Sequence, residues 1–268
     1  RSEVYRNAPE YVTYIKEHIG NHRILNIGQL GLLAEQPSAY QIQDVSVMGM
    51  NNFGDYQDLY LNHLLPKEYH FFTHMTFLQA KDTALINMPL TSFLGVKYIV
   101  LQKDWPMWNA WLTKHLKPAF STKAIAVYEN PDAWPRAFFT ATPDNRMTIE
   151  AVESQKITRK DVTPATISDY HHTRVSINVD APKAGWLVLT DNWHPDWTAT
   201  VNGKSMIVEK RFGTFRAVPV EAGKNLVVFS YQNPAVFLGV TVSTVMLLLS
   251  SVLILFIFVR QRRRQTII

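Results

Sequence analysis

Four side chains able to contact a saccharide lie within the stretch DNWHPDWTATVNGK, residues 191–204. Trp193, His194, Asp196 and Trp197 combine two aromatic rings with an imidazole and a carboxylate. An aromatic face covers the apolar hydrogens of a sugar ring, and a carboxylate accepts hydrogen bonds from its hydroxyl groups. The same group also has a purely structural interpretation, in which Trp197 packs in a core and the stretch only builds a corner between two strands.

Three acids flank the polar loop MGMNNFGD. They are Asp44, Asp55 and Asp58, and the small residues of the loop leave room for a ligand. Asp44 and Asp55 are therefore candidate ligand contacts. Asp55 has an equally good alternative role as the N-cap of a helix expected in DYQDLYLNHLL, where its carboxylate would accept the first free amide hydrogens.

One histidine pair has the spacing of a metal site. His70 and His74 in HFFTH are four residues apart, which places both on one face of a helix. The glutamate that would follow the first histidine is absent, and Glu68 is merely nearby, so no third ligand is evident. We expect no metal site and no cofactor within this chain.

Three tryptophans recur at every third position of DWPMWNAWLTKHL. Trp105, Trp108 and Trp111 suit a stripe at the level of lipid headgroups or the lining of a saccharide cleft. Ordinary packing of a helix explains the same spacing more simply.

The elements that must position these residues form two regions. In residues 1–118, PEYVTYIKEHIG begins near a proline and stops at a glycine as a helix does, while HRILNIG and VKYIVLQ are compact apolar strands. DYQDLYLNHLL and TALINMPLTSFLG are predicted as helices. We therefore expect a small α/β domain at residues 1–118.

From residue 119 the pattern changes to short strands separated by turn residues. The predicted strands are AIAVYEN, AFFTA, TIEAVE, ATISDYH, TRVSINVDAP, WLVLTD, WTATVNGKSMIVEKR and TFRAVPVEAGKNLVVFSY. Their alternation at period two predicts an antiparallel β-sandwich at residues 119–233. Asn202-Gly203 marks a tight hairpin, and a second turn surrounds Gly223.

A transmembrane helix is expected directly after the sandwich. Residues 235–259, AVFLGVTVSTVMLLLSSVLILFIFV, contain no charged residue. As a helix they would be about 37 Å long, enough to cross a hydrocarbon core of about 30 Å. We assign the membrane helix to residues 234–260, and the short proline-stiffened link before it should hold the sandwich close to the bilayer.

The tail RQRRR predicts the orientation of this helix. Its four arginines favour a cytoplasmic end, so residues 261–268 are expected in the cytoplasm and residues 1–233 outside it. The chain begins RSEVYRN, without a methionine or an apolar signal region able to export it. We therefore expect the last part of a longer membrane protein, with a further membrane domain upstream.

The basic excess is confined to this tail. The chain has 27 Lys and Arg, four of them in the tail, against 22 Asp and Glu. With no clustered basic face before Arg260, we expect no nucleic-acid partner. The absence of cysteine excludes a disulfide framework, a thiolate metal site and a cysteine nucleophile.

DNWHPDWTATVNGK followed by FRAVPVEAGKNLVVFSYQNPAVFLG resembles the C-terminal region of the YfhO family of bacterial polytopic membrane proteins. The family stretch has a Tyr-Pro-Gly-Trp turn, a Val-Asp-Gly hairpin, an Arg-x-Val strand, a Pro-Ala-Gly-Lys turn and a Tyr-x-Pro start to its last membrane helix. LGVKYIVL at 94–101 and VYENPDAWPRAF at 127–138 resemble two further family segments. Asp196 departs from the family by standing where a glycine is usual, which puts an acid in place of bare backbone. Asn202 replaces a common aspartate, a conservative change because both residues favour such turns.

This resemblance implies a polytopic protein similar to the GT-C class of glycosyltransferases. These enzymes take sugar from a polyprenyl-phosphate donor outside the cytoplasmic membrane, which implies a lipid bilayer, a lipid-linked sugar and an envelope glycan acceptor as partners. The catalytic acid is expected in an early extracytoplasmic loop upstream, so no catalytic residue is assigned here.

Two functions therefore stay open. In the first, the chain is the extracytoplasmic and membrane-anchoring part of a bacterial envelope glycosyltransferase, where it shapes the acceptor site. In the second, it is a noncatalytic membrane-anchored module for carbohydrate binding or assembly. Trp193, His194, Asp196, Asp44 and Asp55 are the candidate substrate contacts in either case.

Overall fold

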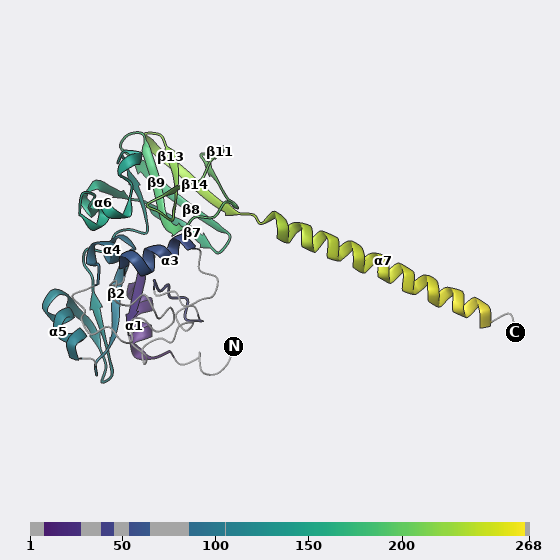
Figure 1. Cartoon of the computed structure of the whole chain (residues 1–268), viewed down its shortest axis with the longest axis horizontal. Coiled ribbons are helices and arrows are strands. Elements are labelled where there is room, and N and C mark those ends of the chain that lie inside the picture. Colours follow the sequence, from purple (N-terminus) through teal and green to yellow (C-terminus); the bar gives the residue numbers. More distant parts are fainter. Residues whose placement is uncertain (1–7, 28–38, 46–53, 65–85, 105, 266–268) are drawn as a thin grey trace.

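The computed structural model describes residues 8–27, 39–45, 54–64, 86–104 and 106–265 (Figure 1). His70, His74 and Trp105 lie outside these residues, as do the side chains of Trp108 and Trp111. Two β-rich regions lie beside each other, and one long helix extends from the second (Figure 1). The predicted α+β class with a C-terminal apolar helix is confirmed.

A four-stranded mixed sheet forms the first region, in the order β1-β2-β4-β3. Its strands are β1 (Arg23–Ile27), β2 (Val96–Gln102), β3 (Lys117–Ser121) and β4 (Ile125–Glu129). β1 and β2 are parallel, and β4 is antiparallel to both of its neighbours. β2 is an inner strand of this sheet. All but one of its seven residues are buried, which agrees with its near-continuous apolar sequence.

Short helices accompany this sheet. They are α1 (Glu10–His18), α3 (Gly54–Asp58), the π-helical turn η2 (Leu59–Leu64), α4 (Met88–Phe93) and α5 (Pro106–His115). α1 buries Tyr11, Val12 and Ile15 on one face, the spacing of an amphipathic helix. α4 begins after Asn87, whose side chain accepts a hydrogen bond from the Leu90 N–H at 3.0 Å and so caps the helix.

Two five-stranded antiparallel sheets form the second region, in the orders β11-β10-β14-β8-β7 and β12-β13-β9-β5-β6. The first contains β7 (Thr166–His171), β8 (Arg174–Ala181), β10 (Trp197–Val201), β11 (Lys204–Met206) and β14 (Gly223–Tyr231). The second contains β5 (Ala137–Thr140), β6 (Val162–Pro164), β9 (Gly185–Asn192), β12 (Glu209–Arg211) and β13 (Phe215–Val220). Alternate residues of β8 are buried, because only one face of that strand lines the core. The predicted sandwich is therefore confirmed.

The hairpin predicted at Asn202-Gly203 joins β10 to β11. Both residues have positive φ, 51° and 82°, and Val201 pairs with Lys204 across the turn. Two positive φ values in a two-residue loop define a type I′ turn, which Asn-Gly favours. The Asn202 side chain accepts a hydrogen bond from the Leu226 N–H at 2.8 Å, which ties the hairpin to β14.

One hydrophobic core passes from the first sheet into the sandwich. Phe93 of α4 contacts Trp134, Phe212 and Phe215, with ring centroids 5.1, 4.9 and 5.6 Å from its own. Phe212 and Phe215 belong to the sandwich side, the first directly after β12 and the second at the start of β13. Buried aromatic rings therefore hold the two regions together.

Two strand predictions were wrong. AIAVYEN was assigned to the sandwich, but as β4 it pairs with β2 and β3 of the first sheet; the expected boundary between residues 118 and 119 falls inside β3. TIEAVE forms the helix α6 (Ile149–Glu153) rather than a strand. Thr148 caps this helix by accepting a hydrogen bond from the Ala151 N–H at 3.2 Å, a local alternative to strand pairing.

Two residues separate the end of β14 from the long helix α7 (Pro234–Gln265). Its first 25 residues, Pro234–Phe258, are long and apolar enough to cross a membrane, and their side chains are exposed rather than packed against the sandwich (Figure 1). An exposed helix that is apolar on all sides requires lipid or another apolar partner around it.

Candidate functional site at the membrane-proximal loop

Residues 193–196 connect β9 to β10 through a tight turn. The Trp197 N–H donates to the His194 carbonyl oxygen at 3.0 Å and closes the turn. The Asp196 N–H donates to Nδ1 of the His194 ring at 3.2 Å, so the imidazole is held over its own loop. The loop is therefore ordered by its own side chain as well as by its backbone.

The same loop is bound to the link that leads into the membrane helix. The Gln232 N–H donates to the Asp196 carbonyl oxygen at 3.1 Å, and the Tyr231 hydroxyl donates to the Asp196 carboxylate at 3.4 Å. The Asn233 amide in turn donates to the Tyr231 hydroxyl oxygen at 3.5 Å. Because α7 begins at the next residue, the loop lies at the end of the sandwich from which the membrane helix leaves.

His194 and Asp196 form a half-buried polar pair. Nδ1 of His194 lies 3.6 Å from Oδ2 of Asp196, and the two side chains are 27% and 23% exposed. The Tyr231 ring lies against the imidazole, with centroids 5.7 Å apart. An exposed edge of imidazole and a carboxylate beside an aromatic ring can bind a polyhydroxyl ligand by hydrogen bonds and by contact with its apolar hydrogens.

The two tryptophans of the loop have different environments. The Trp193 indole N–H donates to the Val208 carbonyl oxygen at 3.0 Å, and Lys210 Nζ lies 5.7 Å from the centre of its ring. Trp197 packs against the sandwich core, and the Arg216 guanidinium lies 3.7 Å above its ring centre. Trp197 is partly buried, so its packing role is combined with a cation–π contact.

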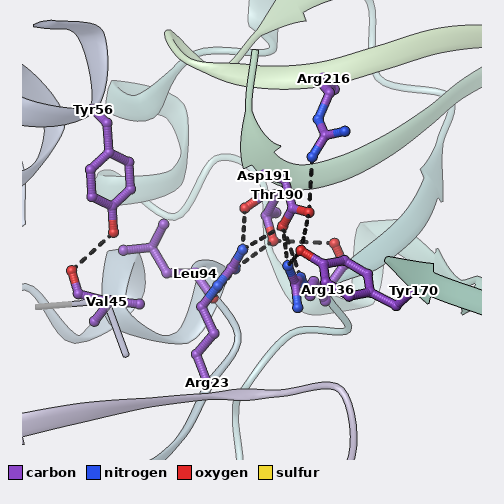
Figure 2. Close-up of polar contacts among 9 residues, drawn as sticks. All are labelled: Arg23, Val45, Tyr56, Leu94, Arg136, Tyr170, Thr190, Asp191 and Arg216. Atoms are coloured by element: carbon purple, nitrogen blue, oxygen red, sulfur yellow. Dashed lines mark hydrogen bonds and ion pairs between the residues drawn. The ribbon is translucent and has the colours of Figure 1, made fainter. Parts of the chain in front are cut away.

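β9 ends in a buried cluster of three arginines around Asp191, directly before the loop (Figure 2). Oδ1 of Asp191 accepts hydrogen bonds from Arg23 at 2.6 Å and from Arg136 at 2.8 Å, and Oδ2 accepts one from Arg216 at 3.0 Å. The Tyr170 hydroxyl also donates to Oδ2, at 3.1 Å. All four charged residues are less than a tenth exposed, so their contacts are shielded from water.

The cluster carries more positive than negative charge. Burial by itself raises the pKa of the Asp191 carboxyl, but the guanidinium groups of Arg136, Arg216 and Arg23 outweigh burial and hold this pKa well below its usual range. Asp191 is therefore ionised at neutral pH, and one carboxylate faces three guanidinium groups. Among the residues that the structure describes, Nε and Nη1 of Arg216 are buried without a hydrogen-bond partner.

Arg23 uses this cluster to join the two regions of the fold. Its guanidinium donates to the Leu94 carbonyl oxygen at 2.8 Å within the first region. It also donates to the hydroxyl and the carbonyl oxygen of Thr190 on β9, at 2.9 and 2.6 Å. One side chain from β1 thereby fixes the strand that carries the loop (Figure 2).

Arg216 completes the connection from the cluster to the loop. Its Nη2 is bound to Asp191, while its guanidinium plane covers Trp197. The first residue of β10 is therefore held against β13 by a charged group that Asp191 anchors. The cluster orders the loop. The polar groups of the loop that stay partly accessible are the side chains of His194 and Asp196.

The two other predicted contact residues lie in the first region. Asp55 pairs with Lys210 at 2.7 Å, and because Lys210 also lies over the Trp193 ring, Asp55 is linked to the loop through that lysine. Asp44 lies beside β1, where its carboxylate accepts a hydrogen bond from the Asn26 N–H at 3.4 Å. The structure therefore brings Asp55, but not Asp44, to the neighbourhood of Trp193.

In the described part of the chain, no group of three or more His, Cys, Asp or Glu side chains is arranged to hold a metal ion. The His194 and Asp196 pair lacks a third ligand of this kind there.

Residues 145–243 match the family model described as bacterial membrane protein YfhO. This region belongs to the YfhO family. The resemblance inferred from the stretch that begins at residue 191 is confirmed, and this family match together with the apolar helix α7 makes the protein a membrane protein. No curated protein and no solved structure matches the chain.

The YfhO match contains the loop and most of its supports. It includes β9 with Asp191, β13 with Arg216, the Tyr231 link and the first part of α7. Arg23 and Arg136 lie outside the matched residues and reach the same carboxylate from earlier parts of the chain.

The buried arginines were missed as site residues, although the sequence carries a signal for them. Arg23, Arg136 and Arg216 each stand at or next to the start of an apolar strand, in HRILNI, PRAFF and FRAVPV. A charge beside a strand that is otherwise buried requires a partner. The identity of that partner, Asp191, is not contained in the local pattern because the three strands are far apart in the sequence.

Proposed function

We propose that this chain is the extracytoplasmic and membrane-anchoring part of a YfhO-like protein that acts in lipid-linked sugar transfer to cell-envelope glycans. In this proposal residues 1–233 lie outside the cytoplasm and the arginine-rich tail lies inside it, as the distribution of basic residues favours. The chain binds and positions the saccharide, and the transfer chemistry belongs to a GT-C-like membrane domain.

The observation that carries the proposal is the attachment of the loop to the link before α7. Backbone and side-chain hydrogen bonds join Asp196 to Tyr231 and Gln232, and the apolar helix starts at Pro234. A sugar attached to a polyprenyl phosphate is held within a short distance of the bilayer surface. The short link between β14 and α7 keeps the loop at the same level.

Each loop residue has a distinct role in this proposal. Asp196 accepts hydrogen bonds from sugar hydroxyls, and the imidazole of His194 offers a second polar contact beside it. The Trp193 ring, whose N–H is already bound to Val208, contributes its face to the apolar side of a sugar. Arg216 and Asp191 keep the loop in place and do not touch the saccharide.

The test is sugar incorporation into envelope glycans in cells whose only copy of the full-length protein carries His194→Ala together with Asp196→Asn. We expect incorporation to fall about tenfold, the effect of losing about 1.4 kcal/mol of binding, with protein abundance unchanged. The matched control is His171→Ala with Asp169→Asn, which removes a similar pair, 3.1 Å apart, from an exposed position on β7. Unchanged incorporation in the loop variant would remove the proposal.

The same cells distinguish the noncatalytic alternative from a role in sugar transfer. If deletion of the whole gene leaves the sugar content of the envelope glycans unchanged, while the full-length protein still binds saccharide through His194 and Asp196, the chain is a carbohydrate-binding or assembly module.

A further inference from the structure

A cavity with a mixed polar and apolar lining lies at the junction of the two regions, formed by residues other than those of the loop. It has a volume of about 610 Å³ and is lined by α4, the end of α5, residues 130–134, α6 and the turn at residues 158–160. This volume is within the range of small-molecule sites, roughly 300–1,000 Å³. In Figure 1, α4 and α6 lie on the side of the molecule opposite to the one from which α7 extends.

The floor of this cavity is rigid. The Asn130 amide donates to the Ser92 hydroxyl at 3.1 Å and to the Val96 carbonyl oxygen at 2.9 Å, and its own oxygen accepts the Asp132 N–H at 3.2 Å. The Trp134 N–H is bound to the Ser92 carbonyl oxygen at 2.8 Å. Residues 130–134 are therefore fixed in place before any ligand binds, which lowers the entropic cost of binding.

One wall carries two cations that have no partner among the described residues. Arg159 and Lys160 line the cavity, and neither makes an ion pair or a side-chain hydrogen bond within the part of the chain that the structure describes. Their turn is held by Thr158 and Asp161, whose carboxylate accepts hydrogen bonds from the Thr158 N–H at 2.7 Å and hydroxyl at 2.8 Å. The turn is thus held by one acid, and the exposed side chains of Arg159 and Lys160 are not used to hold it.

A carboxylate lines the same cavity. Asp132 is exposed and pairs neither with Arg159 nor with Lys160, so both kinds of charge remain available for a ligand. Lone cations suit a phosphate or carboxylate, and a lone carboxylate suits the hydroxyl groups of a sugar. The rest of the lining is mixed, with apolar side chains such as Met88 and Leu116 beside polar ones such as Gln155.

We propose that this cavity binds an anionic saccharide, a sugar carrying a phosphate or carboxylate group, with the anion at Arg159 and Lys160 and the hydroxyls at Asp132. Its position away from α7 favours a glycan over a lipid headgroup as the source of this ligand. The identification of this ligand as the acceptor glycan rests on the proposed function. The binding of an anionic saccharide to the cavity does not depend on that function.

The experiment is isothermal titration calorimetry of the full chain in detergent micelles at physiological ionic strength. Glucose 6-phosphate is expected to bind at millimolar concentration or below, at least about tenfold more tightly than glucose. Arg159→Gln with Lys160→Gln should abolish this preference. Lys156→Gln, an exposed lysine three residues earlier that does not line the cavity, is the matched control and should keep the preference.

Several results would overturn the assignment. They are no binding of glucose 6-phosphate at millimolar concentration, equal binding of glucose, or a preference that survives in the double variant. Inorganic phosphate that binds as tightly as glucose 6-phosphate would show a phosphate site rather than a saccharide site. The variant with His194→Ala and Asp196→Asn should still bind glucose 6-phosphate, so failure at the loop and failure at the cavity are distinguishable.

Discussion

At the scale of single residues, the Asp191 carboxylate is the acceptor that holds the buried arginine cluster together. It accepts hydrogen bonds from three arginines that come from β1, from the residue before β5 and from β13. Replacing a buried ion cluster by apolar groups is often harmless, whereas removing one partner leaves charge buried without compensation. Asp191 is the only acid that pairs with these arginines among the described residues, so its loss is the damaging one.

We predict that Asp191→Asn lowers the free energy of unfolding by about 3–5 kcal/mol at neutral pH, the usual effect of breaking a buried pair. The pKa of Asp191 is lower in the folded than in the unfolded chain, so the unfolded state binds this proton first as pH falls. The stability due to Asp191 is present above the unfolded pKa of about 3.9 and is lost as pH falls toward the folded pKa. Chemical denaturation of the full chain in detergent micelles, from neutral pH to about pH 3, measures both effects.

The control is Asp169→Asn, which removes an exposed carboxylate whose one ion pair among the described residues is with His171. A surface pair of this kind contributes at most about 1 kcal/mol, so its curve should follow that of the wild type. If the curves of Asp191→Asn and the wild type instead run parallel down to about pH 3, Asp191 does not carry the expected charge coupling.

At the scale of elements, the hairpin and the caps show how local chemistry decides the structure. Asn202-Gly203 forms the expected turn because both residues tolerate positive φ. TIEAVE alternates like a strand but becomes α6, since Thr148 caps it and three of its five residues are buried. A cap and a helical pattern of burial therefore outweigh an ambiguous alternation over so short a stretch.

We predict that Gly203→Ala lowers the free energy of unfolding by about 1 kcal/mol or slightly more. A Cβ at this position meets no atom within 4 Å, but the φ of +82° is unfavourable for any L side chain. Gly54→Ala is the matched control, because it also has open space and lacks a positive φ. It should leave stability unchanged or raise it by up to about 1 kcal/mol. Equal effects of the two substitutions in the same denaturation experiment would contradict the turn argument.

At the scale of the whole molecule, specific contacts join the first region to the sandwich and the sandwich to the link before α7. Phe93 and the rings of the sandwich share one core, and Arg23 adds hydrogen bonds across the same junction. Asp196 then binds the link that leads to α7. The orientation of the first region is thereby transmitted to the sandwich, and the loop stays at the foot of the membrane helix.

The orientation of α7 can be tested with single cysteines, because residues 1–268 contain none and any cysteine upstream can be replaced by serine. We predict that in intact cells a membrane-impermeant maleimide labels the Lys183→Cys variant of the full-length protein, at an exposed turn of the sandwich. The Thr266→Cys variant, in the arginine-rich tail, should be labelled only after the cells are permeabilised. The reverse pattern would place the sandwich in the cytoplasm.

Features that depend on short segments can be predicted from the amino-acid sequence. The apolar run of α7 and the Asn-Gly hairpin are local signals that gave the correct element, and the alternation gave the sandwich class although it misassigned AIAVYEN and TIEAVE. The quoted stretch from 191 onward also identified the YfhO family. Such features follow from propensity, turn chemistry and solubility in lipid, which neighbouring residues set among themselves.

The contacts between residues that are distant in the sequence could not be predicted and became known from the fold. The partner of Arg23, Arg136 and Arg216 is separated from two of them by more than fifty residues, and β4 left the sandwich to pair with β2. The meeting of Asp132 with Arg159 and Lys160 around one cavity is of the same kind. Contacts of this sort depend on the register of strands and on how two regions share a core, and a single sequence contains no local pattern that fixes either.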